Sequence, residues 1–250
     1  MTGDESDNTF GAEDLECIPT VRFFRRALIQ DCDLVPWGSN YTFGVLLEDP
    51  EGEFDETLAI YKPGAGEIPL WDFPDDTLYL REYAAYLVSE ALGWHFIPTT
   101  VIRDGPHGVG TVQEYIEPEK DTHYFTFRDE YREELKRMAL FDLITNNADR
   151  KAGHCLRGLA DGRIWGIDHG LTFNVQPKLR TVIWDFQEEP IDEALLADLR
   201  RIGADGELAT RLLRYLNPLE VRAFALRLNR ILATAVFPPL MSRRSIPWGF

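Results

Sequence analysis

Two short polar segments on either side of a predicted β-hairpin constrain this chain more than any other feature. Residues 146–154 (NNADRKAGH) precede an apolar segment, an Asp-Gly turn and a second apolar segment, and residues 167–170 (IDHG) follow. Apolar segments joined by such a turn are typical of paired strands. Because a hairpin brings its strand ends together, we predict that Asp149, His154 and Asp168 converge at one end of it.

Two carboxylates and an imidazole at one point suit a particular chemistry. One carboxylate can orient or deprotonate a hydroxyl group, while the other groups hold a divalent cation on phosphate oxygens. The alternative is that Asp149 and Asp168 are turn or capping residues, since aspartate is common in turns.

Length and charge limit the functional classes. A chain of 250 residues is long enough for one large domain or two small lobes, and with 44% hydrophobic residues it can form a substantial core. The net charge of −16 argues against nucleic-acid binding and against attraction to an anionic membrane surface. No apolar run reaches the roughly 18 residues of a transmembrane helix, so no stable membrane insertion is expected.

The cysteines and the N-terminus indicate the compartment. Cys17, Cys32 and Cys155 are odd in number and form no C-x-x-C pair, which argues against a disulfide framework or a zinc site and fits a reducing, cytoplasmic location. Residues 1–16 are acidic and polar, so we expect them to be disordered and not a signal peptide.

The first half of the chain alternates short strands with one helix. Strands are predicted at residues 41–47, 57–61, 98–101 and 109–116, and a helix at residues 78–92. Residues 75–77 (DDT) are predicted to cap that helix, while residues 23–30 fit either a strand or a short helix.

Lys62 and Glu82 are the charged residues of interest in this half. Lys62 ends a predicted strand, where a lysine is most often solvated. Glu82 lies in the second turn of the predicted helix, beside its apolar stripe. It is either a surface charge or the partner of an ion pair that aims Lys62 at phosphates.

A polar break at residues 117–121 separates this half from a mainly helical one. Helices are predicted at residues 131–145, 191–202, 206–216 and 218–234. The predicted fold class is therefore α+β and bilobal, with an antiparallel β N-lobe that contains one helix (residues 17–116) and a mainly helical C-lobe (residues 117–250).

This order of elements resembles the protein-kinase-like fold, and several motifs are more specific. The segments AIYKP, NADR and IDHGLTF resemble the phosphate-lysine strand, catalytic loop and metal loop of phosphoinositide 3- and 4-kinases and of HipA-type kinases. Together with PLWDFP, Arg81-Glu82 and LRTVIWDF, they resemble a family of small actinobacterial proteins described as phosphatidylinositol 3-/4-kinase-like. The resemblance covers nearly the whole chain after about residue 20.

The resemblance implies an ATP-dependent kinase and a role for each site residue. Asp149 would position the acceptor hydroxyl and accept its proton, and Asp168 would bind the metal ion that bridges the β- and γ-phosphates. Lys62, oriented by Glu82, would hold phosphate oxygens. The nucleotide would also be bound by a loop over the phosphates (Gly38, Ser39 and Asn40) and by a hinge at the adenine (Glu114, Tyr115 and Ile116).

One metal-binding position departs from the family pattern. The residue five positions after the catalytic aspartate is usually asparagine, an oxygen ligand, but here it is His154. Imidazole suits Mn²⁺ better than Mg²⁺, so either the metal preference shifts towards Mn²⁺ or the second metal is lost. A structural, hydrogen-bonded His154 is the third interpretation. His169 stands where phenylalanine is usual, which weakens the case for a regulated switch at that residue.

The predicted function is transfer of the γ-phosphate of ATP to a protein or small-molecule hydroxyl, which the acidic net charge favours over a lipid. A nucleotide-binding pseudokinase and a nucleotidyl transferase on the same fold are the alternatives. Arg150, Lys178 and Arg180 lie near the site in the sequence and either bind an anionic acceptor or balance the acidic site.

Overall fold

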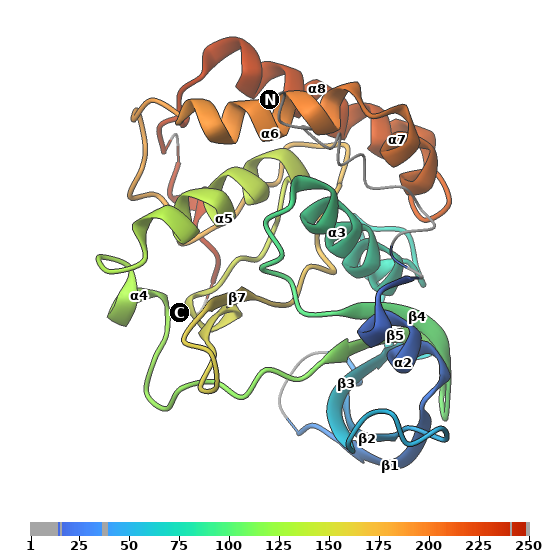
Figure 1. Ribbon diagram of the computed structural model, residues 1–250. Coiled ribbons are helices and arrows are strands. Elements are labelled where there is room, and N and C mark those ends of the chain that lie inside the picture. Colours follow the sequence, from blue (N-terminus) through green and yellow to red (C-terminus); the bar gives the residue numbers. More distant parts are fainter. Residues whose placement is uncertain (1–14, 16, 37–39, 241, 249–250) are drawn as a thin grey trace, which may run out of the picture.

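The computed structural model describes residues 15, 17–36, 40–240 and 242–248. A five-stranded antiparallel sheet forms one end of the molecule and a set of helices the other (Figure 1). The strands follow the spatial order β1-β2-β3-β5-β4. Their bounds are Leu28–Leu34 (β1), Phe43–Glu48 (β2), Thr57–Pro63 (β3), Thr100–Gly105 (β4) and Gly108–Glu114 (β5).

The sheet buries one face against helix α2 (Pro19–Arg26). Side chains alternate across a strand, so Ala59 and Tyr61 of β3 enter this core together with Phe23 and Phe24 of α2. Lys62, between Tyr61 and Pro63, therefore projects from the opposite face of the sheet. The fold thus gives the lysine a fixed direction that its position at a strand end did not guarantee.

Helix α3 (Leu78–Leu92) connects the sheet to the helical part. It ends at Gly93, whose φ of 69° is readily adopted by glycine. The predicted cap at residues 75–77 contains the observed N-cap residue, Thr77, but the Thr77 side chain makes no capping hydrogen bond. Instead the Glu67 carboxylate accepts the backbone N–H groups of Leu78 (3.0 Å) and Tyr79 (2.7 Å). A carboxylate at this end also complements the helix dipole.

The second half of the chain contains the remaining helices and a small second sheet. Its helices are α4 (Tyr124–Phe127), α5 (Arg132–Thr145), α6 (Glu193–Ala204), α7 (Gly206–Leu212) and α8 (Pro218–Thr234). Strands β6 (Cys155–Arg157) and β7 (Ile164–Gly166) form the predicted hairpin. The described residues also form 3₁₀ turns: η1 (Gly64–Gly66) after β3, and η2 (Ala152–His154) and η3 (Arg243–Ser245) in the helical part. Helices α3 and α5 lie between the layer of α6, α7 and α8 and the sheet (Figure 1).

One apolar core joins α3 to the helices of the second half. It contains Tyr83 and Leu87 of α3, Leu140 and Phe141 of α5 and Leu199 of α6. Because α3 shares this core, its position relative to α5 and α6 is fixed by burial of apolar surface.

The predicted α+β, two-lobed architecture is confirmed. The segment that fitted either a strand or a helix contains the end of α2 and the start of β1, with Ala27 between them. The proposed disordered residues 1–16 lie outside the described residues except Leu15, which is buried. No described helix is long and apolar enough to cross a membrane.

Candidate active site

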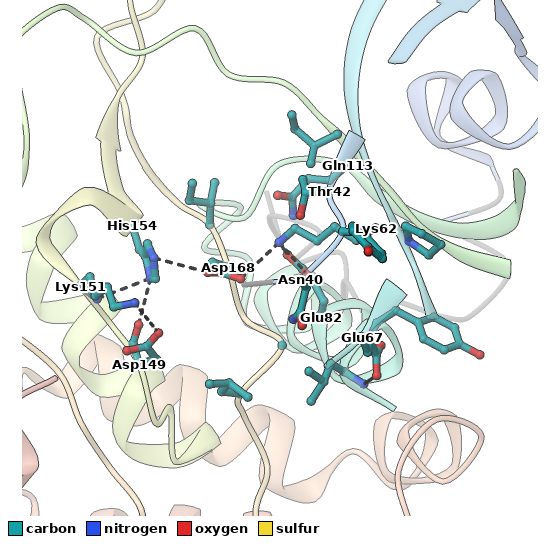
Figure 2. A pocket seen from close by; sticks show the side chains of 18 of the residues that line it. Asn40, Thr42, Lys62, Glu67, Glu82, Gln113, Asp149, Lys151, His154 and Asp168 are labelled. Atoms are coloured by element: carbon teal, nitrogen blue, oxygen red, sulfur yellow. Dashed lines mark hydrogen bonds and ion pairs between the residues drawn. The ribbon is translucent and has the colours of Figure 1, made fainter. Parts of the chain in front are cut away.

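A cleft of about 600 Å³ lies between the open face of the sheet, α3 and the two polar loops that flank the small hairpin. Lys62, Glu82, Asp149, His154 and Asp168 all line it (Figure 2). The predicted convergence around the hairpin is observed, since His154 Nε2 lies 3.4 Å from Asp168 Oδ2. Residues separated by more than one hundred positions in sequence thus share one cavity.

Lys62 and Glu82 form an ion pair at the inner wall of the cleft. The Lys62 ammonium lies 2.7 Å and 3.0 Å from the two Glu82 oxygens and 3.3 Å from Asp168 Oδ1. Burial alone would lower the pKa of Lys62, but the two carboxylates outweigh burial and raise it. Burial raises the pKa of Glu82 against the opposing effect of Lys62. The expected orientation of the lysine by Glu82 is therefore present.

Asp168 lies beside the Lys62–Glu82 ion pair, in contact with the Lys62 ammonium. Its φ of 60° is left-handed, which is uncommon for a residue other than glycine but tolerated by aspartate. Its side chain is half exposed, so the carboxylate remains available to a ligand in the cleft. The pKa of Asp168 is lowered, chiefly by the Lys62 ammonium, so the group is ionised at neutral pH.

Asp149 is positioned by its own loop. Its backbone N–H donates to Asn147 Oδ1 at 3.0 Å, which fixes the turn that follows α5. The Lys151 ammonium lies 2.9 Å from Asp149 Oδ2 and also lines the cleft. Lys151 was not selected from the sequence. The signal that could have found it is its position two residues after Asp149 in the same loop, where two side chains can lie close together.

The tautomer of His154 follows from its hydrogen bonds. Its Nδ1 lies 2.9 Å from the backbone carbonyl of Asp149 and 3.5 Å from the backbone N–H of Lys151; the shorter contact is to an acceptor, so we assign the proton to Nδ1. Burial lowers the pKa of His154, which leaves the ring neutral and Nε2 unprotonated. Nε2 therefore directs a lone pair at the Asp168 carboxylate. A cation between these two groups would relieve their repulsion, and metal-bound histidines usually donate their other N–H to a carbonyl or carboxylate.

The cleft offers few protein ligands for a metal ion. The described residues contain no group of three or more His, Cys, Asp or Glu side chains that could hold an ion. Magnesium typically binds to one or two carboxylates together with substrate phosphates and water. Asp168 fits that pattern, in which the nucleotide brings the remaining ligands, whereas the imidazole of His154 is a donor better suited to Mn²⁺.

Arg150 balances buried charge and is not placed to bind an acceptor. It is wholly buried, and its Nε and Nη2 lie 3.0–3.2 Å from the buried Asp142 carboxylate. Its Nη1 donates to the carbonyls of His154 and Ile167. This network ties the Asp149 loop to the Asp168 loop. The buried His169 contacts Arg150 Nη2 through Nε2 at 2.7 Å, and its ring lies near Phe96 and Phe141.

The other two cations near the site differ from Arg150. The Lys178 ammonium lies 2.5 Å from Asp72 Oδ2 and 4.7 Å from the ring centroid of Trp71, outside the cleft lining. Trp71 itself is 92% exposed. Arg180 is exposed, so the charge-balance and acceptor interpretations both remain open for it.

The expected nucleotide segments are placed in part. Gly38 and Ser39 lie outside the described residues. Asn40 lines the cleft, but its Oδ1 accepts the Ile68 N–H at 2.8 Å, so it braces the loop after η1.

The three expected hinge residues all line the cleft. The N–H groups of Glu114 and Tyr115 donate to Thr99 and Leu58 carbonyls. Within the described part of the chain, the Ile116 N–H has no acceptor and is free for a ligand.

Solved structures with a similar fold define the class of fold. The structure of hydra Fam20 with sugar has a TM-score of 0.55 and 13% identity, and the match covers 89% of this chain and 88% of that one. The Golgi casein kinase with Mn/ADP bound has a TM-score of 0.52 and 12% identity, covering 86% and 74%. The chain therefore has a protein-kinase-like fold.

Sequence comparison identifies the family within that class. No family model matches the chain. The chain belongs to the family of Protein Rv2133c of Mycobacterium tuberculosis, with 36% identity over 273 residues. The match covers 92% of this chain and 96% of that protein.

Proposed function

We propose that the protein is an ATP-dependent phosphotransferase that moves the γ-phosphate to a hydroxyl acceptor. The observation that carries the proposal is the joint placement of the Lys62–Glu82 ion pair, Asp168 and Asp149 in one cleft. Phosphoryl transfer depends on positioned charge more than on covalent chemistry, so a lysine and two carboxylates with distinct partners are suited to it. Residues 17–116 supply the nucleotide-binding lobe, and residues 117–250 supply the catalytic and metal loops.

Each side chain has a defined task in this proposal. Lys62 holds phosphate oxygens, and Glu82 keeps its ammonium directed into the cleft. Asp149 orients the acceptor hydroxyl and takes its proton. Lys151 neutralises Asp149 in the described structure. If its ammonium pairs with the γ-phosphate when nucleotide binds, Asp149 is freed to accept hydrogen bonds from the acceptor.

The metal ion is proposed to bind to Asp168 and His154. It would neutralise charge on the β- and γ-phosphates while the nucleotide is bound. The unprotonated Nε2 of His154 beside Asp168 favours this role over the purely structural one. Either Mg²⁺ or Mn²⁺ can use these donors, and the imidazole favours Mn²⁺. Manganese and ADP are bound in the Golgi casein kinase structure, a neighbour in fold.

The acceptor is proposed to be a protein or a small molecule. The net charge of −16 opposes approach to an anionic bilayer, so the phosphatidylinositol substrate that the family resemblance suggests is disfavoured. Incubation of the enzyme with anionic vesicles and with candidate protein fractions, each with labelled ATP, separates the two classes of acceptor.

The test uses the full chain with labelled ATP and either Mg²⁺ or Mn²⁺, with ADP release and intact mass read together. Lys62→Ala and Asp168→Asn are expected to abolish transfer, while Asp149→Asn abolishes transfer but retains nucleotide binding. Lys120→Ala, which removes an exposed lysine, is the control and is expected to leave activity unchanged. Full activity in Asp168→Asn would refute the site assignment, and metal-dependent ATP binding without turnover would identify a pseudokinase.

A second experiment addresses the metal. If His154 is a ligand, His154→Asn shifts the preference from Mn²⁺ towards Mg²⁺. A wild-type protein that strongly prefers Mg²⁺, with no gain of Mg²⁺-dependent turnover in His154→Asn, would exclude the ligand role.

A further inference from the structure

A buried glutamine borders the cleft immediately before the hinge. Gln113 lies in β5 and is only 4% exposed, yet it lines the cleft. Its partner in β3 is Ile60, just as Thr111 is the partner of Lys62, so Gln113 projects from the same face of the sheet as the lysine. It is drawn in Figure 2 among the side chains of the cleft. A polar side chain at this depth needs a hydrogen-bond partner or a ligand.

Neighbouring hydrogen bonds fix the orientation of the Gln113 amide. The Thr100 hydroxyl donates its only hydrogen to the carbonyl of Pro98 at 2.8 Å. The Thr100 oxygen can then act only as an acceptor for its second neighbour, Gln113, at 2.8 Å. Gln113 must therefore present its NH₂ group to Thr100, and its carbonyl oxygen Oε1 points the other way.

The Oε1 atom is left available to a ligand. Among the residues that the structure describes, none donates a hydrogen bond to it. It is also absent from the set of fully buried side-chain atoms that lack a partner, so solvent reaches it. Since Gln113 borders the cleft, Oε1 meets the cavity. The fold thus holds one oriented acceptor beside the hinge, with its direction set by Thr100 and Pro98.

We propose that Gln113 selects nucleotides that carry a 6-amino group on the purine ring. Adenine presents two N–H donors at this position, whereas guanine and hypoxanthine present the acceptor O6. An acceptor that cannot rotate accepts a hydrogen bond from the amino group and repels the keto oxygen. This inference rests on the proposed function, because it assumes that the base lies against the hinge. Gln113 is then a specificity residue that touches the base but not the reacting phosphates.

The wild-type protein provides the first test, which needs no variant. Dissociation constants for ATP and for inosine triphosphate, a 6-keto analogue, are measured by calorimetry with Mn²⁺ present. We expect ATP to bind about 10- to 100-fold more tightly, the range for a lost hydrogen bond that leaves a buried polar group unpaired. Equal binding of the two nucleotides would overturn the inference and leave the proposed function standing. Binding of neither nucleotide would refute the proposed function itself.

Two variants separate the side chain from the hinge backbone, which also contacts the base. Gln113→Leu is expected to weaken ATP binding and to leave inosine triphosphate nearly unchanged. Thr100→Val removes the hydroxyl that orients the amide, so Gln113 can rotate and present its NH₂ group to O6. In Thr100→Val we therefore expect tighter binding of inosine triphosphate, an outcome that general destabilisation does not produce.

Thr111→Val is the matched control. Thr111 lies two residues from Gln113 on the same face of β5, and its buried hydroxyl has no hydrogen-bond partner among the described residues. The ratio of the two dissociation constants should equal the wild-type ratio in this variant. Two results would show that the proposal is wrong. One is an equal change of the ratio in Thr111→Val and Thr100→Val. The other is a ratio that stays at the wild-type value in Thr100→Val and Gln113→Leu while both variants retain their melting temperatures.

Discussion

Replacement of Arg150 by methionine should be among the most destabilising single changes in this protein. Arg150 and Asp142 are both wholly buried, with nitrogen–oxygen distances near 3.0 Å. At an effective dielectric constant of about 20, their attraction is about 5 kcal/mol. Loss of one partner from a buried pair typically costs about 3–5 kcal/mol, because the other charge remains buried without compensation.

The loss should be larger than for an ordinary core residue, because Arg150 also satisfies the carbonyls of two loops of the candidate site. For a chain of this size, about 3–5 kcal/mol corresponds to a fall in melting temperature of about 6–20 °C. Thermal unfolding followed by circular dichroism measures it. Nucleotide affinity should fall at a temperature where the variant is still folded, because the Asp149 and Asp168 loops lose their common anchor.

Arg180→Met is the matched control, because the Arg180 side chain is exposed while its backbone carbonyl accepts the Arg150 N–H. Its expected cost is within about 0.5 kcal/mol. The double variant Arg150→Met/Asp142→Asn should recover part of the stability, because no uncompensated charge remains. If Arg150→Met melts within about 2 °C of Arg180→Met, the buried pair does not stabilise the fold as argued.

Three further predictions test other parts of the structure. Gly110→Ala should lower the free energy of unfolding by about 1–3 kcal/mol and weaken nucleotide binding, because a Cβ there would lie 2.6 Å from Pro63 Cα and against the Lys62 carbonyl. Gly44→Ala is the control: a Cβ at Gly44 meets open space, so the melting temperature should change little. Burial raises the pKa of the Cys155 thiol to about 12, so a thiolate-specific reagent should label it only after unfolding, and rapid labelling of the native protein would contradict this. A hydrogen bond to Glu90 raises the pKa of His95, so the pair stabilises the fold at pH values below the ordinary pKa of histidine, and this stabilisation is lost as the pH rises through the raised pKa. Glu90→Gln should therefore lower the melting temperature more near about pH 5.5 than near about pH 8.5. An equal effect at both pH values would exclude the ion pair.

The sequence determined those elements whose formation depends on neighbouring residues. Helices α3 and α8 were predicted with their observed bounds, because periodic apolar residues, a following glycine or a leading Asn-Pro are local signals. The small hairpin was predicted from an Asp-Gly turn, and with it the convergence of Asp149, His154 and Asp168 on one cleft. Residues 23–30 fitted either a strand or a helix, so the boundary between α2 and β1 was not predicted, and neither was helix α4; these elements are short and acquire their apolar partners from elsewhere in the chain.

Only the tertiary structure decided which distant groups pair. It placed the Glu67 carboxylate on the first N–H groups of α3, buried Arg150 against Asp142, and joined the Gln113 amide to Thr100. A charged or amide side chain carries no local signal of its partner, because the favourable partner is set by burial and by hydrogen bonds across the fold. The sequence therefore determined which residues could do chemistry, and the fold decided which of them face a ligand and which support the site from within.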